Sequence, residues 1–245
     1  MNLHILGSNS FGNCYILEAA DGALILEAGI RMPEVKKALR WNMGRVTGAV
    51  VSHQHNDHAG YVREMVASGV TVLALPEVFR SHGIEGAPFT HPVIAGHGYR
   101  LGSYRILVLP VKHDVPCAGF VISHPEMGRL LFVTDTVAFD YIVPRLNTVM
   151  IEANYADDIV DENIALGRMH AAMRPRLLNS HMELEQTKAI LAAHDLSKVN
   201  NIVLIHLSDG NSDEARFVSE VQRLTGRPTC AARPGMNVDI SLKPY

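Results

Sequence analysis

The feature that most constrains this chain is a group of four potential metal ligands that directly follows an apolar run. The run, residues 48–51, is typical of the end of a buried strand, and His53, His55, Asp57 and His58 follow it at once. Alternate side chains of an extended segment point the same way, so His53 and His55 can converge on one ion. Asp57 and His58 fall in a tighter turn and can face a second ion. Imidazole and carboxylate suit zinc and its first-row neighbours, whereas solvated loop histidines would not need such crowding.

Length and composition favour one compact domain. The 245 residues, 47% of them hydrophobic, can bury a large core, and we expect a single domain over residues 1–245. The balance of 22 basic against 25 acidic side chains argues against a broad electrostatic grip on nucleic acid, but it leaves room for a local cationic groove.

Cysteine usage and hydropathy indicate a cytoplasmic protein. Cys14, Cys117 and Cys230 are scattered and odd in number, so no disulfide framework is expected, and each is expected to be a small buried apolar group. No apolar run approaches membrane-spanning length, and the N-terminus lacks a secretory signal.

Strands and helices alternate in both halves of the chain. Expected strands cover residues 3–7, 14–18, 23–27, 47–52, 70–75, 104–111, 119–123, 129–134, 149–152, 201–205, 229–232 and 238–242. Expected helices cover residues 33–40, 61–67, 76–82, 158–172, 183–194 and 212–224, the last with Ser212 or Asn211 as N-cap. Residues 83–98 are expected to be irregular, and 177–179 to be a short apolar segment. This pattern favours an α/β fold, an αββα sandwich of two layered mixed sheets flanked by helices.

Five expected strand ends carry metal-binding residue types. They are the segment from His53 to His58, His113, Asp135, Glu152 and His206. A histidine that only packs in the core would lie inside an apolar run, and these do not. Their shared position predicts a single site built on one face of the sheet. The Gly-, Ser- and Asn-rich residues 7–13 form either a plain hairpin connection or a rim of this site that offers hydroxyl and N–H groups to an anion.

The order and type of these residues resemble the metallo-β-lactamase superfamily. The resemblance implies two divalent ions, zinc or manganese, with Asp135 bridging them; one ion is held by His53, His55 and His113, and the other by Asp57, His58 and His206. A bridging Asp, where β-lactamases of this fold commonly carry Cys or lack the bridge, favours phosphodiester chemistry. Two such ions would lower the pKa of a shared water towards about 7, and the hydroxide, oriented by Asp57, would attack phosphorus in line.

Local motifs resemble the WalJ (YycJ) group of 5′-exonucleases, which are related to RNase Z and RNase J. These motifs are residues 7–15, 151–154 and 206–208. The resemblance implies a nucleic-acid substrate, DNA or RNA, and a catalytic Glu152–His181 couple in which His181 protonates the leaving group. Glu27 stands where the group usually has Asp, and the segment 179–183 departs from its usual His-Leu-Ser-Asn. We therefore expect a rearranged contact beside the ligands at Glu27.

Spacing limits what else the chain can contain. Asp135 and His206 are 71 residues apart (206 − 135), which leaves no room for the large cap domain inserted in RNase J-like relatives. Substrate contacts would come from the rim, with Arg145, Arg168, Arg174 and Arg176 as candidates. Four alternatives remain at this point: a hydrolase of small esters, thioesters or lactones, a cyclic-nucleotide phosphodiesterase, a β-lactamase, and a metal-binding regulatory module.

Overall fold

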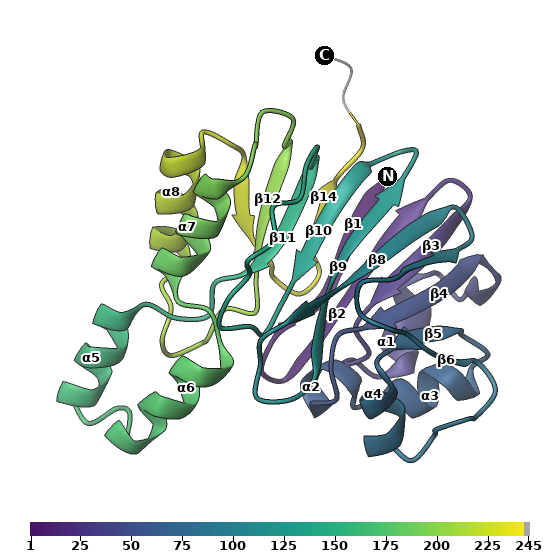
Figure 1. The fold of residues 1–245 in the computed structure, drawn as a ribbon, viewed down its shortest axis with the longest axis horizontal. Helices are drawn as coiled ribbons and strands as arrows, with labels where there is room; N and C mark the ends of the chain where they lie inside the picture. The colour runs from purple at the N-terminus through teal and green to yellow at the C-terminus, as the bar shows by residue number, and fades with distance from the viewer. Residues whose placement is uncertain (243–245) are drawn as a thin grey trace.

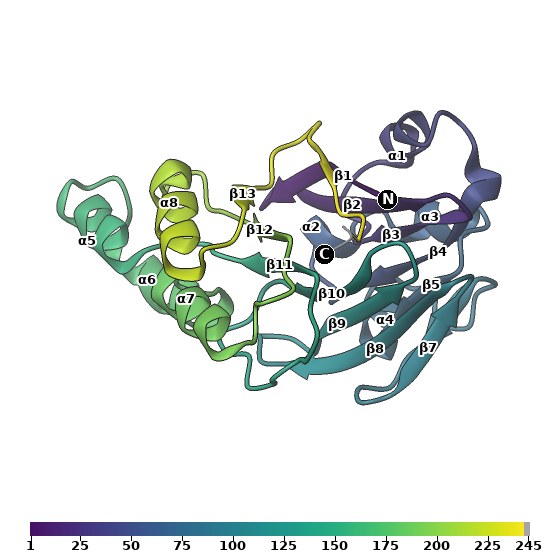
Figure 2. The same ribbon diagram turned by 90° about the horizontal axis from the view of Figure 1, so that it is seen from above.

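Two mixed β-sheets stacked face to face form the body of the molecule (Figures 1 and 2). This computed structural model describes residues 1–242, and within them each sheet has seven strands. The first sheet has the order β14 (Asn237–Asp239), β1 (Asn2–Asn9), β2 (Gly12–Ala19), β3 (Gly22–Leu26), β4 (Val46–Val51), β5 (Val72–Ala74), β6 (Thr90–Pro92). The second has the order β13 (Thr229–Ala231), β12 (Asn201–Ile205), β11 (Thr148–Glu152), β10 (Gly128–Val133), β9 (Cys117–His124), β8 (Tyr104–Val111), β7 (Gly98–Leu101).

Helices cover the outer faces of both sheets. On the first sheet lie α1 (Met32–Ala38), α3 (Val62–Ala67) and α4 (Pro76–Ser81), with α2 (Asn56–Ala59) at the edge. On the second lie α7 (Leu184–Ala193) and α8 (Glu214–Thr225), while α5 (Asp157–Ala165) and α6 (Arg174–Ser180) extend beyond the sheet (Figure 1). The expected αββα sandwich is confirmed. None of the helices within residues 1–242 is long and apolar enough to cross a bilayer.

Burial on both faces explains the apolar strand sequences. In β3, Leu24 and Leu26 point into the core between the sheets, while Ile25 packs against the helices outside. All five residues of this strand are buried, as expected for a strand with both faces covered. In β8, Ile106 points into the same inner core and Arg105 points outward. The two sheets therefore share one apolar layer, and polar groups collect at its edges.

The topology brings the functional strand ends to one edge. β10, β11 and β12 run parallel, so their C-terminal ends lie side by side. β8 points the same way, because it pairs antiparallel with β9, which pairs antiparallel with β10. β4 of the opposite sheet delivers its own end to the same edge, as the contacts described below show.

Some local expectations were wrong. The helix expected over 158–172 ends at Ala165, because Gly167 adopts a left-handed φ of +69° there. The chain then forms a 3₁₀ turn and α6, which contains the segment 177–179. The N-cap of α8 is Asp213, whose carboxylate accepts the Arg216 N–H; Ser212 instead donates to a backbone carbonyl.

Two smaller corrections concern strands and cysteines. Residues 83–98 are not wholly irregular, because β6 lies within them and β7 begins at Gly98. Cys14 and Cys117 are buried as expected, whereas Cys230 is half-buried.

Gly29 offers a test of how tightly the edge is built. A Cβ at this position would lie 1.8 Å from the Asp57 carbonyl oxygen and 2.5 Å from the Asn13 amide nitrogen. We expect Gly29→Ala to cost about 1–3 kcal/mol of unfolding free energy, as overpacking does, or roughly 2–10 °C in Tm. Gly210→Ala is the control, because nothing lies within 4 Å of its Cβ position. Equal melting temperatures for both variants by circular dichroism would contradict this packing.

Candidate metal centre

The backbone at the strand ends turns the candidate side chains inward. His53 and His55 follow β4, and Asp57 and His58 lie in the short helix α2. Asp135 and His206 come just after β10 and β12 and adopt left-handed φ values of 35° and 54°. A non-glycine residue in this region costs of order 1–3 kcal/mol. The surrounding structure therefore maintains two strained residues at the point where the site is built.

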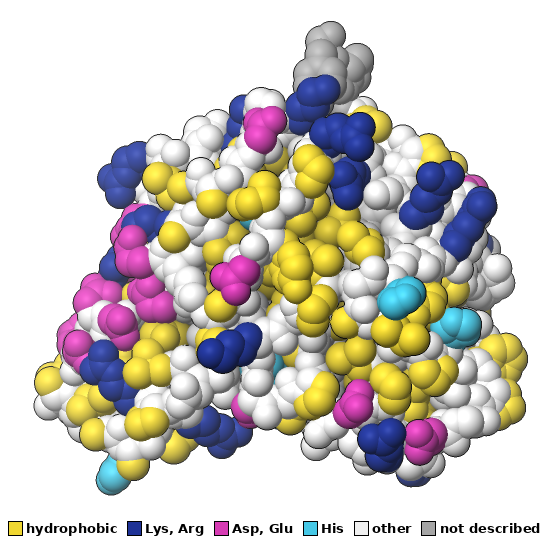
Figure 3. Space-filling model, in the orientation of Figure 1, with side chains coloured by type: hydrophobic (Ala, Val, Ile, Leu, Met, Phe, Trp, Pro, Cys, Tyr) yellow, Lys and Arg dark blue, Asp and Glu magenta, His cyan; other side chains and the backbone are white. Residues whose placement is uncertain are grey.

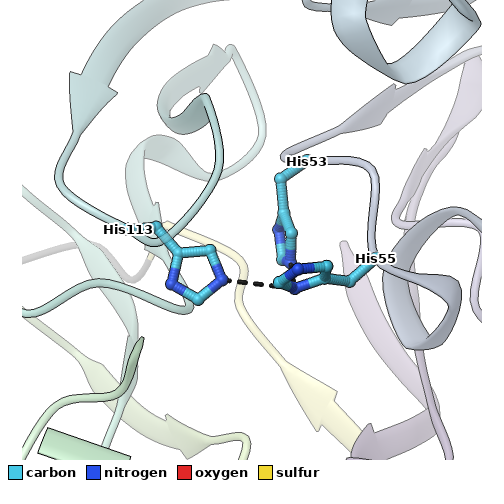
Figure 4. A group of neighbouring side chains, drawn as sticks. All are labelled: His53, His55 and His113. Carbon is cyan, nitrogen blue, oxygen red and sulfur yellow. Dashed lines mark hydrogen bonds between the residues drawn. The ribbon is translucent and has the colours of Figure 1, made fainter. Parts of the chain in front are cut away.

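Three histidines form the first half-site (Figure 4). His55 Nδ1 lies 3.0 Å from His53 Nε2 and 3.3 Å from His113 Nε2. The rings come from the loops after β4 and β8 and point toward one another. His53 is fully buried, and its other ring nitrogen contacts the Ser52 hydroxyl at 2.9 Å. Three ring nitrogens thus face one point.

Asp57, His58 and His206 form the second half-site, next to the first. Asp57 Oδ2 lies 3.2 Å from Nε2 of both His58 and His206. Asp135 lies between the half-sites. Its Oδ1 is 3.2 Å from His58 Nε2, whereas its Oδ2 is 3.9 Å from His53 Nε2. The two oxygens of one buried carboxylate therefore face the two half-sites separately.

These donors fit metal ions. The first half-site gathers three ring nitrogens, and the second gathers two ring nitrogens and two carboxylate oxygens, each set within 4.8 Å of one another. Imidazole with carboxylate is the donor set of zinc and of neighbouring first-row ions. Carboxylates buried this deeply are rare without a cation or a hydrogen-bonded partner. The structure thus brings together all seven residues that the sequence predicted as ligands.

Glu27 supports the second half-site from behind, as the sequence suggested. Its buried carboxylate accepts the Ser52 N–H at 3.2 and 3.3 Å and lies 3.5 Å from His58 Nδ1. That nitrogen forms no hydrogen bond within residues 1–242. Burial raises the pKa of Glu27 despite its contacts with His58 and Ser52. Glu27 is therefore a neighbour of the ligand rather than a ligand.

Two asparagines and an aspartate at the site had no predicted role. Asn13 Nδ2 donates to the Asp57 carbonyl oxygen at 3.2 Å and lies 3.1 Å from His58 Nε2. Asn154 Nδ2 donates to the His206 carbonyl oxygen at 2.8 Å. Asp114 Oδ1 lies 3.1 Å from His113 Nε2 and 3.4 Å from His55 Nε2. The only sequence signal was their adjacency to ligands or their place in quoted motifs.

The loop over residues 7–13 combines both expected roles. β1 and β2 extend to Asn9 and Gly12, so the connection is a tight hairpin. Ser8 Oγ nevertheless accepts the His206 N–H at 3.0 Å, and Asn13 contacts the second half-site as described. The hairpin therefore forms one wall of the centre.

Glu152 and His181 lie beside the two half-sites. Glu152 Oε1 is 2.7 Å from His181 Nδ1, and Oε2 accepts the backbone N–H groups of Thr136 and Met182, each at 3.1 Å. His181 Nδ1 is also 3.7 Å from Asp135 Oδ2. Burial acts to lower the pKa of His181, but the Glu152 carboxylate outweighs it and raises that pKa. His181 is 21% exposed, and its Nδ1 is held by the Glu152 carboxylate.

The half-sites differ in their protonation. Burial lowers the pKa of His53 and His113 below the ordinary histidine value. Burial acts the same way on His58 and His206, but the Asp135 carboxylate and hydrogen bonds outweigh it. The pKa of His58 is therefore raised well above its usual value, and that of His206 is raised to about 10. His58 and His206 therefore hold their protons more tightly than His53 and His113 do.

The fold and these donors define the class of protein. The model of the metallo-beta-lactamase superfamily matches residues 7–149, and the chain belongs to this superfamily. The resemblance inferred from the motifs is thus confirmed, and the chain is a metallo-hydrolase of this class.

Particular relatives narrow the comparison. The chain is 26% identical over 240 residues to "Exodeoxyribonuclease YycJ" of Bacillus anthracis, covering 91% of this chain and 90% of that protein. Among solved structures, it is similar to the metallo-beta-lactamase fold protein YhfI from Bacillus subtilis, with a TM-score of 0.74, 14% identity and coverage of 97% and 99% of the two chains. It is also similar to human tRNase Z, short form, with a TM-score of 0.63, 12% identity and coverage of 98% and 99%. These two structures support the fold.

The protonation difference predicts two distinguishable metal-binding events. Zinc or manganese should displace fewer protons from His53 and His113 than from His58 and His206. Binding at the second half-site should release about one to two protons, since the ion displaces them from His58 and His206. The apparent affinity of that event should therefore rise with pH until pH approaches the pKa of His206, about 10. Calorimetric titration of the metal-free protein in buffers of different ionisation enthalpy measures the number of protons released in each binding event. Equal proton release in both binding events would contradict the assignment. Separately, Asp135→Ala should bind at least one ion fewer than the wild type, because the carboxylate common to both half-sites is gone.

Proposed function

We propose that the chain is a phosphodiesterase that uses two divalent ions, zinc or manganese, and acts as a 5′-exonuclease on DNA or RNA. The observation that carries this proposal is the Glu152–His181 pair, whose ring lies beside Asp135. The oxygen that leaves a nucleic-acid phosphodiester is an alkoxide, which is a poor leaving group and needs a proton. His181, next to the metal centre, is the acid that would donate this proton.

Each group of residues has a proposed role. When bound, the two ions would supply Lewis acidity, which lowers the pKa of water and neutralises phosphate charge. Asp57 would orient the attacking water by accepting a hydrogen bond from it. His181 would donate the proton on Nε2 to the leaving oxygen, while Glu152 holds Nδ1. The metal ligands in this proposal are His53, His55 and His113 for one ion, Asp57, His58 and His206 for the other, and Asp135 for both.

The relatives support nucleic acid over smaller esters. The relative with 26% identity is named an exodeoxyribonuclease, so linear DNA is the first substrate to test. A hydrolase of esters, thioesters or lactones would need the same half-sites, but the Glu152–His181 pair would have no task. The substrate tests below separate these alternatives.

We further propose that residues 1–245 act as a single domain without an inserted cap. Between Asp135 and His206 lie β11, α7 and β12, which belong to the second sheet and its covering helices, and the short helices α5 and α6, which extend beyond the sheet. Substrate would then contact the rim of the core itself. Arg174 is ion-paired with Asp157 and Asp161, which makes it a weak rim candidate. Three rim arginines have no ion pair within residues 1–242: Arg145, Arg168 and Arg176.

Exonuclease action predicts a dependence on free ends. Metal-loaded protein should degrade linear single-stranded DNA or RNA labelled at the 5′ end and leave circular single strands of the same sequence intact. His53→Ala, purified in parallel, controls for contaminating nucleases. Comparable loss of both substrates would point to an endonuclease, and turnover only of cyclic nucleotides would point to a small-molecule phosphodiesterase.

The role of His181 predicts a substrate-dependent defect. His181→Ala should lower kcat on nucleic acid by roughly 10²–10⁴, the usual value of a positioned proton donor. An activated aryl phosphodiester needs no proton on its leaving group and should be much less affected. Glu152→Gln should show a weaker version of this pattern, because it orients the ring without donating the proton.

Metal content separates this role from a structural one. Atoms of His181 and Glu152 lie within 4.8 Å of ligand atoms of Asp135 and His206. Both variants should nevertheless retain the wild-type number of ions by elemental analysis, because the proposed ligands are seven other residues. Equal losses on the two substrates would remove His181 from the acid role.

A further inference from the structure

A row of three arginines crosses the second sheet far from the metal centre. Arg100 of β7 pairs directly with Arg105 of β8, Arg105 with Ser123 of β9, and Ser123 with Arg129 of β10. Directly paired residues of antiparallel strands project from the same face. With strands about 4.8 Å apart, the row spans roughly 14 Å. We call these four residues the arginine row.

The row lies on the outer face of the sheet and lines a groove. Its neighbours along the strands, such as Ile106 and Ile122, point into the inner core, so the row points outward. Arg100 and Arg105 are exposed, while Ser123 and Arg129 are half-buried. All four residues line a hollow of about 380 Å³ and an adjoining one of about 490 Å³. In the space-filling view, basic side chains gather along the upper edge and upper right of this face, and acidic ones over the helices at left (Figure 3).

Within residues 1–242 the arginines of the row have no carboxylate partner, and Arg100 and Arg129 each donate to a backbone carbonyl instead. Arg100 and Arg105 are like charges on directly opposite residues, an arrangement that destabilises a sheet. No carboxylate of residues 1–242 forms an ion pair with any arginine of the row. Asp21, beside the groove, instead contacts His124 at 3.1 Å. By contrast, five other arginines of the chain are ion-paired: Arg45, Arg80, Arg174, Arg216 and Arg233.

The next row toward the metal centre is apolar. Leu107 pairs with Val121, and Val121 with Leu131, so these side chains also project from the outer face. Leu107 and Val121 line the same hollow as the arginines. Val121 and Leu131 are buried and Leu107 is half-buried, so the groove offers cations with only a narrow apolar border. A row of arginines without carboxylate partners suits a ligand with regularly spaced oxyanions, which a nucleotide strand presents.

We propose that the arginine row binds phosphates of the nucleic-acid substrate at a distance from the bond that is cleaved. This inference rests on the proposed nuclease function. Arg105 precedes His113 by eight residues, six of them to the end of β8 at Val111, so the two lie up to roughly 26 Å apart. At about 3.4 Å per nucleotide of a duplex strand, the row engages substrates of about eight nucleotides or more. Shorter substrates contact the metal centre but not the arginine row.

The experiment compares a triple variant with a matched control. Arg100→Gln, Arg105→Gln and Arg129→Gln are combined, and the control combines Arg40→Gln, Arg223→Gln and Arg227→Gln, which removes the same charge elsewhere. Metal-loaded proteins are titrated against a phosphorothioate-linked 24-nucleotide single strand by fluorescence anisotropy at several salt concentrations. Hydrolysis of a dinucleotide, a 24-mer and bis(p-nitrophenyl) phosphate is measured in parallel.

The expected result is specific to long substrates. The row variant should bind the 24-mer at least tenfold more weakly. The slope of its log binding constant against log salt concentration should fall in magnitude by about two, since each phosphate contact contributes roughly 0.7 on single strands. KM for the 24-mer should rise, while hydrolysis of the dinucleotide and of bis(p-nitrophenyl) phosphate stays unchanged. The control should match wild type. Melting should be unaffected or occur at a higher temperature, because like charges are removed from adjacent strands.

Other outcomes overturn the inference or the nuclease proposal separately. Equal 24-mer affinity of row variant and control, or no binding by wild type, would overturn the role of the row. An effect only on self-association by sedimentation would also overturn it, and would assign the row to an acidic protein surface. Binding of the 24-mer that depends on the arginine row, without hydrolysis of any nucleic acid, would support phosphate binding by the row and reject the proposed nuclease activity.

Discussion

The arrangement of the whole site depends on the position of one buried carboxylate. Asp135 presents Oδ1 to His58 and Oδ2 toward His53, so it is common to both half-sites. Its pKa is held well below the ordinary value, because the charges of His206 and His58 outweigh the effect of burial. Such a group is stable in the interior only while cationic groups surround it. The sandwich meets this requirement by ending strands of both sheets at the same edge.

Local sequence patterns predicted much of this edge. An apolar run followed by His53, His55, Asp57 and His58 gave both the end of β4 and the division of those side chains between two half-sites. The same reasoning applied to Asp135 and to the other strand ends, because a strand period of two and an abrupt change to polar residues are both visible in a single sequence. The two-sheet fold followed from the number of apolar strands and from the family resemblance.

Features that depend on distant parts of the chain were not predicted. Asn13 contacts His58 across 45 positions of sequence, and no local pattern indicates that pairing. The arginine row exists only because of the register of four strands, since Arg105 and Arg129 are 24 positions apart (129 − 105). Helix α5 ends at Ala165, before the left-handed Gly167. This glycine is present in the sequence, but the helix-forming residues around it favoured a longer helix.

The left-handed backbone at Asp135 and His206 has a consequence for how this protein can change under selection. Glycine would relax either position at no steric cost, but it would remove a ligand. Selection for heat resistance alone would therefore favour glycine or asparagine there, whereas selection for turnover would oppose it. Descendants that have lost catalysis should collect such replacements early and gain robustness as they do. A laboratory library screened only for folding should drift the same way.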